Sequence, residues 1–176
     1  MSKLITWIDL QGCYMVTASK AEDDEALELV WNNICNHFGL PVDHPHFYLE
    51  PEVLQVKIDT LSGEGFRYGA LQNGPSGNRD GLDGAWEMDI DGTPTINMPK
   101  ARGVHMDSIR LMRNAELVKE DLNMLKALEN GDTDTQNIVR AKKQELRDIP
   151  QTFDLTTEND TPLELKDKWP EGLPKE

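Results

Sequence analysis

The stretch that decides the fold is DSIRLMRNAELVKEDLNMLKALENGDTDTQNIVRAKKQELRDIP, residues 107–150. Its first half carries apolar residues at spacings of four, three, four and three, namely Leu111, Ala115, Val118, Leu122 and Leu125. These are the a and d positions of antiparallel or coiled-coil packing, sustained for about two heptads. A helix is predicted from an Asp107 N-cap to the stop signal at Asn130-Gly131. Further apolar residues widen the stripe and indicate more than one neighbour: Ile109, Met112, Met124 and Leu128.

The second half of this stretch predicts a shorter and more polar helix, from about Asp134 to Arg147. Thr133 and Gln136 have the spacing of a capping box, and Pro150 is expected to end the helix. Two helices joined by so short a link must pack antiparallel. The buried edge of the second helix is expected at Ile138, Val139, Leu146 and Ile149.

A short tail follows an acidic linker over residues 151–160. Thr161-Pro162-Leu163-Glu164 has the form of a helix start, with an N-cap, a proline in the first turn and a capping-box glutamate. The predicted helix reaches Lys168 and is broken by Trp169-Pro170. A helix this short is not stable alone. The apolar side chains of the tail must therefore dock, either on this chain or on a partner: Leu163, Leu165 and Trp169.

The first hundred residues predict a small α+β domain. Residues 4–18 and 85–98 each have the pattern of a β-hairpin, and a helix is expected from about Asp23 to Phe38. Residues 66–71 are typical of a strand, while residues 51–61 fit a strand by β-branching and a helix by spacing. The expected fold class is α+β, in three parts: an N-terminal α+β domain over 1–100, an antiparallel helical hairpin over 105–150, and an extended linker with a short docking tail over 151–176.

Composition excludes some function classes. The formal net charge is −14, and nucleic-acid binding needs a cationic footprint, so no nucleic acid is expected as partner. No apolar run approaches the ~20 residues of a membrane span, so no membrane is expected either. Cys13 and Cys35 fit no zinc spacing and predict a buried, reduced pair.

Four segments carry weak signals for chemistry. Asp43, His44 and His46 stand close together, but no further ligand follows at a metal-site spacing, so a turn with solvated histidines is favoured. The glycine-rich residues 72–84 match no phosphate loop and predict a mobile surface loop. Asp89-Ile90-Asp91-Gly92 lacks the closing glutamate of a calcium loop. Residues 99–105 are expected to be a basic connector that either is solvated, which is favoured, or meets an acidic surface of a partner subunit. No cofactor, metal or catalytic residue is predicted, and the chain is expected not to be an enzyme.

One motif resembles a known family. Lys143, Gln144, Leu146, Arg147, Asp148, Ile149 and Pro150, followed by Trp169 and Pro170, resemble the C-terminal region of tailed-bacteriophage tail assembly chaperones and tail-fibre assembly proteins. The resemblance covers about residues 105–174. It implies a non-enzymatic protein that assembles, attaches or caps a tail fibre or other tail component through protein–protein docking. The expected docking residues are Leu146, Arg147, Asp148, Ile149, Leu163, Leu165 and Trp169.

The resemblance also implies partners and a location. The expected partners are other phage tail proteins of the fibre or baseplate, and a homo-oligomer is left open. The expected location is the host cytoplasm during assembly. The alternative is a permanent virion subunit of the tail, structural or host-recognising. The linker over residues 151–160, longer and more acidic than the family link, favours this alternative.

Overall fold

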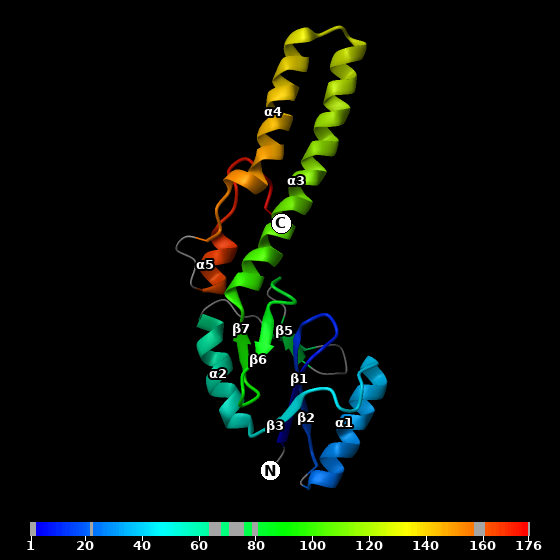
Figure 1. Ribbon diagram of the computed structural model, residues 1–176, viewed down its shortest axis with the longest axis vertical. Coiled ribbons are helices and arrows are strands. Elements are labelled where there is room, and N and C mark those ends of the chain that lie inside the picture. The colour runs from blue at the N-terminus through cyan, green and yellow to red at the C-terminus, as the bar shows by residue number, and fades with distance from the viewer. Residues whose placement is uncertain are drawn as a thin grey trace. The chain divides into compact units, whose positions relative to one another are not determined.

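The computed structural model describes residues 3–21, 23–63, 68–70, 76–78, 81–156 and 161–175 (Figure 1). The fold is α+β, as the sequence predicts. The chain forms two compact units. The sheet unit comprises residues 1–104 and 161–163, and the hairpin unit comprises residues 105–160 and 164–176.

A five-stranded antiparallel sheet organises the sheet unit, with strand order β3-β1-β2-β5-β4. Its strands are β1 (Lys3–Ile8), β2 (Tyr14–Ser19), β3 (His46–Leu49), β4 (Tyr68–Ala70) and β5 (Ser76–Asn78). The β1–β2 hairpin is the one predicted over residues 4–18, and β4 lies in the predicted strand at 66–71.

Two strands lie where the sequence predicted loops. Strand β3 occupies part of the loop expected over residues 40–50, and it pairs with β1. Strand β5 lies in the glycine-rich stretch and pairs with both β2 and β4. The expectation of a loop throughout 72–84 was therefore wrong for residues 76–78, while residues 72–75 and 79–80 lie outside the described part. Backbone pairing in this sheet prevails over the low strand propensity of Ser-Gly-Asn.

Helix α1 (Asp24–Phe38) begins and ends where its sequence signals stand. The Asp23 carboxylate accepts a hydrogen bond from the Ala26 amide at 2.8 Å, which satisfies an amide that no helical carbonyl reaches. Gly39 ends the helix with a φ of 68°, in the left-handed region that glycine adopts without a Cβ clash. The ambiguous segment over 51–61 is also helical, as α2 (Pro51–Gly63).

Alternate side chains of β1 and β2 enter two different buried clusters. Ile5 and Trp7 pack with the apolar stripe of α1, and the Trp7 ring lies edge-on to Trp31 and Phe38 at 5.8 and 5.7 Å. On β2, Met15 joins this first cluster. Its neighbours Tyr14 and Val16 join a second cluster, which also contains residues of α2 and β6. The period of two along a strand thus buries the sheet on both faces.

The hairpin predicted over 85–98 is present as β6 (Trp86–Met88) and β7 (Pro94–Ile96). Its turn is anchored to the sheet, because the Thr6 and Tyr14 hydroxyls donate to the Gly92 carbonyl at 3.0 and 2.9 Å. Gly92 has a φ of 81°, and a Cβ there would lie 2.5 Å from the Phe47 Cβ. This turn therefore requires glycine.

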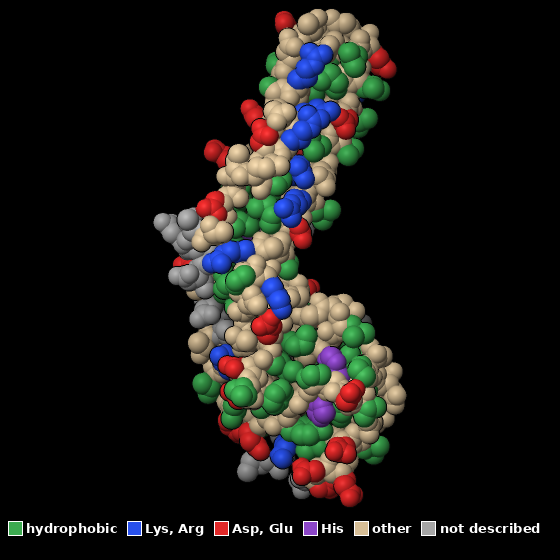
Figure 2. All heavy atoms as spheres, viewed as in Figure 1, with side chains coloured by type: hydrophobic (Ala, Val, Ile, Leu, Met, Phe, Trp, Pro, Cys, Tyr) green, Lys and Arg blue, Asp and Glu red, His purple; other side chains and the backbone are tan. Residues whose placement is uncertain are grey.

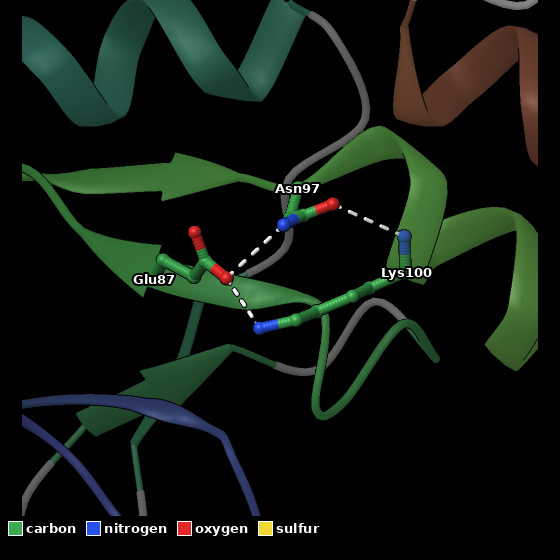
Figure 3. A network of polar contacts seen from close by, with 3 residues as sticks. All are labelled: Glu87, Asn97 and Lys100. Atoms are coloured by element: carbon green, nitrogen blue, oxygen red, sulfur yellow. Dashed lines mark hydrogen bonds and ion pairs between the residues drawn. The ribbon is translucent and has the colours of Figure 1, made fainter.

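Helix α3 (Met98–Glu129) begins nine residues before the predicted Asp107 N-cap, so the expectation of a connector over 99–105 was wrong. The physical reason is Asn97, whose side chain accepts from the Lys100 amide at 3.2 Å and caps the helix. Figure 3 shows Glu87 of β6 facing both residues: its carboxylate accepts from the side-chain Nδ2 of Asn97 at 3.2 Å and pairs with the Lys100 ammonium. The Lys100 ammonium holds the pKa of Glu87 below its usual value. Asp107 instead pairs with Arg110 at 2.7 Å.

Helix α4 (Thr133–Thr152) follows α3, and α5 (Pro162–Asp167) forms the predicted short helix of the tail. The N-cap of α4 is Asp132, which accepts from the Thr135 amide at 3.0 Å, so the assignment of the cap to Thr133 was wrong. Pro150 lies inside α4 and does not end it. The last turn is held beyond the proline, because the Phe153 amide donates to the Ile149 carbonyl at 2.9 Å and the Thr152 hydroxyl donates to the Asp148 carbonyl at 3.0 Å.

Candidate protein–protein interface

The hairpin unit brings α3 and α4 side by side and antiparallel, as predicted (Figure 1). Polar contacts cross between them. The Lys142 ammonium lies 2.6 Å from the Glu120 carboxylate, and Lys143 pairs with Asp121. At the loop, the Gln136 side chain donates to the Ala127 carbonyl at 3.3 Å. These contacts fix the pairing of the two helices.

Glu120 is the buried carboxylate of this helix pair. Hydrogen bonds from Lys142 and then from Asn123 hold its pKa below its usual value, against the smaller opposing effect of burial. The same pairing raises the pKa of Lys142. Both groups are therefore charged at neutral pH, and the carboxylate has a structural role in the packing of α3 on α4.

The face of α3 toward α4 is not the predicted heptad seam. Glu120 and Ala127 are buried on α3, and Val139 and Leu146 are buried on α4. The four large side chains of the seam are instead between 58% and 66% exposed: Leu111, Val118, Leu122 and Leu125. Figure 2 shows hydrophobic side chains gathered along the free edge of the hairpin on its α3 side. The seam is thus not the contact between α3 and α4, and the coiled-coil interpretation of it stays open.

The buried edge of α4 is confirmed at Val139 and Leu146, and Ile149 is half-buried. Ile138 was wrongly assigned to this edge, because its side chain is 68% exposed. It lines a shallow groove between α3 and α4 near the connecting loop, together with Ala127, Val139 and Lys142.

The end of the chain packs on the first turns of α3 within the hairpin unit. The buried His105 ring lies edge-on to the Trp169 ring at 5.6 Å, and its Nε2 is 2.8 Å from the Lys168 carbonyl. The Trp169 indole N–H donates to the Leu173 carbonyl at 2.9 Å. Burial, together with the nearby Lys175 and Lys166, lowers the pKa of His105. A neutral imidazole therefore suits this site at neutral pH.

The predicted docking residues fall into two groups. Leu146 and Leu165 are buried, and Ile149 and Trp169 are half-buried. Three residues face solvent: Arg147, Asp148 and Leu163. The first group is engaged in the fold of this chain, so the tail docks intramolecularly in this structure. Binding of a partner by any of the seven residues stays a prediction.

The residues weighed for metal binding have structural partners. His44 Nε2 lies 2.6 Å from the Ile8 carbonyl, and the His46 ring stacks on Trp31 with centroids 4.0 Å apart. Both histidines are half-buried, so the expectation of solvated histidines was wrong. Among the described residues, no three His, Cys, Asp or Glu side chains are grouped as a metal site would require. Cys13 and Cys35 are buried free thiols, as predicted.

The sequence did not single out Glu120, Lys142 and His105, which join the two helices and the tail within the hairpin unit. For Glu120 a signal existed: it stands opposite the heptad seam, at the position that would contact a helix on the other side of α3. His105 lay inside the predicted connector and offered no such signal. No helix within the described residues has the length and apolar character needed to cross a membrane.

Comparisons with known proteins give no relative for this chain. No protein-family model, no curated protein and no solved structure matches it.

Proposed function

We propose that this chain is a non-enzymatic assembly protein that acts by protein–protein docking through its hairpin unit. The observation that carries the proposal is the solvent-exposed apolar face of α3, formed by Leu111, Val118, Leu122 and Leu125. A row of leucine and valine side chains exposed on one helix face costs free energy unless a partner covers it. The other face of the same helix is already packed on α4.

We further propose that the assembly is a bacteriophage tail, in which the protein assembles, attaches or caps a fibre or another component. The support is the motif resemblance over residues 143–150 and 169–170. Within that motif Leu146 is buried, while Arg147 and Asp148 point outward from α4. This arrangement leaves a charged pair on a rigid helix, and rim charges of this kind contribute to partner choice.

The shifted ionisable groups support a structural role for the carboxylates. Each of the following has a lowered pKa because of a hydrogen bond within the fold: Glu87 from Lys100, Asp91 from Thr93, Glu120 from Lys142 and Asp132 from Thr135. Asp132 is a helix cap, Glu120 joins two helices, and Glu87 holds the start of α3. Such shifts in a structural network differ from those of an active site, where they prepare a group for proton transfer.

The test is co-expression with tail components encoded by the neighbouring genes, followed by affinity capture and size-exclusion chromatography. We expect one fibre or baseplate component to co-elute with the wild-type chain. Arg147→Glu should weaken this complex, because it reverses an exposed charge of the motif without removing a buried group. Arg140→Glu, an exposed arginine of α4 outside the motif, is the matched control. Separate elution from every tail component would contradict the proposal.

Purified virions distinguish transient from permanent association. A chaperone should be present during assembly and absent from mature particles, whereas a structural or host-recognition subunit should be retained at a fixed copy number. Quantitative mass spectrometry of virions and of assembly intermediates measures this difference.

A further inference from the structure

The exposed face of α3 has the register of a two-stranded coiled coil. Ala115 and Leu122 are at a positions, and Leu111, Val118 and Leu125 are at d positions. All five are exposed. The f positions Glu120 and Ala127, on the opposite side of the helix, are buried. Helix α4 therefore covers the back of α3 and leaves the seam open along its length.

We propose that the occupant of this seam is the same seam of a second copy of this chain, with the two α3 helices parallel. The inference rests on the proposed function, because it names a second copy of this chain as a partner of the same exposed face of α3. Within the assembly, a dimer would present two copies of the Arg147–Asp148 pair to a tail component.

The charges beside the seam select both the partner and its direction. Lys119 and Lys126 stand at e positions, and Asp121 stands at a g position. In a parallel pair, a g residue meets the e residue five positions on in the other chain. Asp121 thus meets Lys126 of the second copy, and this contact occurs twice by symmetry.

An antiparallel pair would place like charges together. There, e positions face e positions and g positions face g positions, so lysine would meet lysine and Asp121 would meet its own copy. Like charges at such contacts are destabilising. The sequence of α3 is therefore self-complementary in the parallel direction and in conflict with itself in the antiparallel direction.

The pairing of Asp121 with Lys143 is compatible with this arrangement. The Asp121 side chain is 60% exposed although one of its oxygens, Oδ1, bonds Lys143. A carboxylate has two oxygens and accepts more than two hydrogen bonds. Asp121 can therefore bind Lys143 of its own α4 and Lys126 of the second α3 together.

The first experiment measures mass by sedimentation equilibrium on the full chain over a wide concentration range. We expect a reversible monomer–dimer equilibrium. Leu122→Lys should raise its dissociation constant about 30-fold or more, because it places a charge at the centre of the seam. Leu29→Lys is the matched control, since Leu29 is a similarly exposed leucine, at 64%, on helix α1. Circular dichroism of each variant verifies that its helices are retained.

A second variant tests the seam without changing an apolar residue. Lys126→Glu replaces two attractive contacts with repulsive ones and should raise the dissociation constant roughly 3- to 10-fold. The effect should shrink at high salt, as expected for exposed charges. An unchanged dissociation constant in both Leu122→Lys and Lys126→Glu would overturn the proposal.

A third experiment tests direction. Parallel packing brings position 125 of one copy next to position 125 of the other, so Leu125→Cys should give a disulfide-linked dimer under mild oxidation. The native thiols of Cys13 and Cys35 are buried and should not cross-link. Peptide mapping verifies that the disulfide joins position 125 of the two copies. Leu29→Cys should not cross-link. A dimer that fails to link at 125 would exclude the parallel register.

The results separate this inference from the proposed function. A specific dimer of this kind should have a dissociation constant below about 100 µM. A chain that stays monomeric up to that concentration therefore overturns the inference. If that monomer still captures a tail component, the assembly function stands. A parallel dimer that captures no tail component leaves the inference in place and contradicts the assembly function.

Discussion

In the sheet unit, β1 and β2 send alternate side chains into two buried clusters, whereas in the hairpin unit α3 buries one face and leaves an apolar face exposed. Trp7 is fully buried, but Leu122 is 59% exposed. Exposed apolar side chains occur in both units, for example Leu29 and Ile90 in the sheet unit, but those of α3 share one helix face, so burying them together would remove a continuous apolar area from water. The second unit retains exposed apolar area along one face of α3.

The contrast extends to polar contacts. In the sheet unit, hydroxyls of Thr6 and Tyr14 converge on one carbonyl, that of Gly92, and lock a turn. In the hairpin unit, the long side chains of Lys142 and Lys143 bridge two helices. Each pair has one well-exposed partner, Lys142 or Asp121, so screening by solvent keeps its contribution small, and the hairpin depends on its few buried apolar residues and on its tail.

The largest effect is expected in the sheet unit. Trp7→Ala should lower the free energy of unfolding by about 3–5 kcal/mol, because it removes the ring that packs against Trp31 and Phe38 and leaves a cavity. Urea unfolding followed by circular dichroism measures the change. Leu29→Ala, at an exposed position of α1, is the control and should change it by less than about 0.5 kcal/mol. A loss below about 1 kcal/mol for Trp7→Ala would mean that this cluster does not stabilise the unit.

An intermediate effect is expected at the tail. Trp169→Ala should cost about 1–3 kcal/mol, because the ring is half-buried against His105 and its N–H bonds the Leu173 carbonyl. Hydrogen exchange of α5 and the first turns of α3 would locate the loss. Trp169→Phe keeps an aromatic ring without the N–H and should lose less. Unchanged exchange in Trp169→Ala would show that the tail is not held by this contact.

A smaller and pH-dependent effect is expected between the helices. Glu120→Gln should cost about 1 kcal/mol at neutral pH, because it removes the charge that Lys142 and Asn123 stabilise. The pKa of Glu120 is lower in the folded than in the unfolded state, so the unfolded state binds more protons as pH falls. The contribution is therefore present above pH 4.5, the ordinary value, and is lost as pH falls through the folded pKa.

Denaturant unfolding of both proteins between pH 3 and 7, about the span over which a carboxyl titrates, measures this difference. Wild type and Glu120→Gln should converge in acid. Glu129→Gln, at an exposed glutamate of α3, is the control and should stay within about 0.5 kcal/mol of wild type at every pH. A difference that is constant with pH would indicate a loss of packing and not a loss of charge.

Local signals predicted much of this fold. The Asp23 cap and Gly39 stop bound α1, and the alternation along β1 and β2 predicted a hairpin, because these depend on residues close in sequence. Strand β5 was missed, since Ser76-Gly77-Asn78 has no strand propensity and forms through pairing with β2 and β4. The start of α3 was missed although its signal is local: the Asn97 side chain accepts from the Lys100 amide three residues on, and Pro99 stands in the first turn.

The candidate interface shows the same limit. Periodicity identified an apolar stripe on α3, but it does not say which neighbour the stripe contacts. Helix α4 packs on the other side because Glu120 and Ala127 meet Lys142, Val139 and the loop. Similarly, the need of Trp169 for a docking site was evident, but the choice of His105 as its neighbour depends on the folded chain.

The smallest effect in dilute solution is expected for Leu122→Ala, and its comparison with Leu146→Ala is the sharpest test of the contrast between buried and exposed leucines. Leu146→Ala and Leu122→Ala are the same chemical change in the same hairpin, at 6% and 59% exposure. In dilute solution, where the chain is monomeric, Leu146→Ala should cost about 2–5 kcal/mol and Leu122→Ala less than about 0.5 kcal/mol. Raising the protein concentration should then increase the cost of Leu122→Ala alone, because only association buries that residue and so links its contribution to mass action. Equal costs in dilute solution would mean that the chain itself covers the seam, and a cost of Leu122→Ala that is independent of concentration would mean that no second copy does.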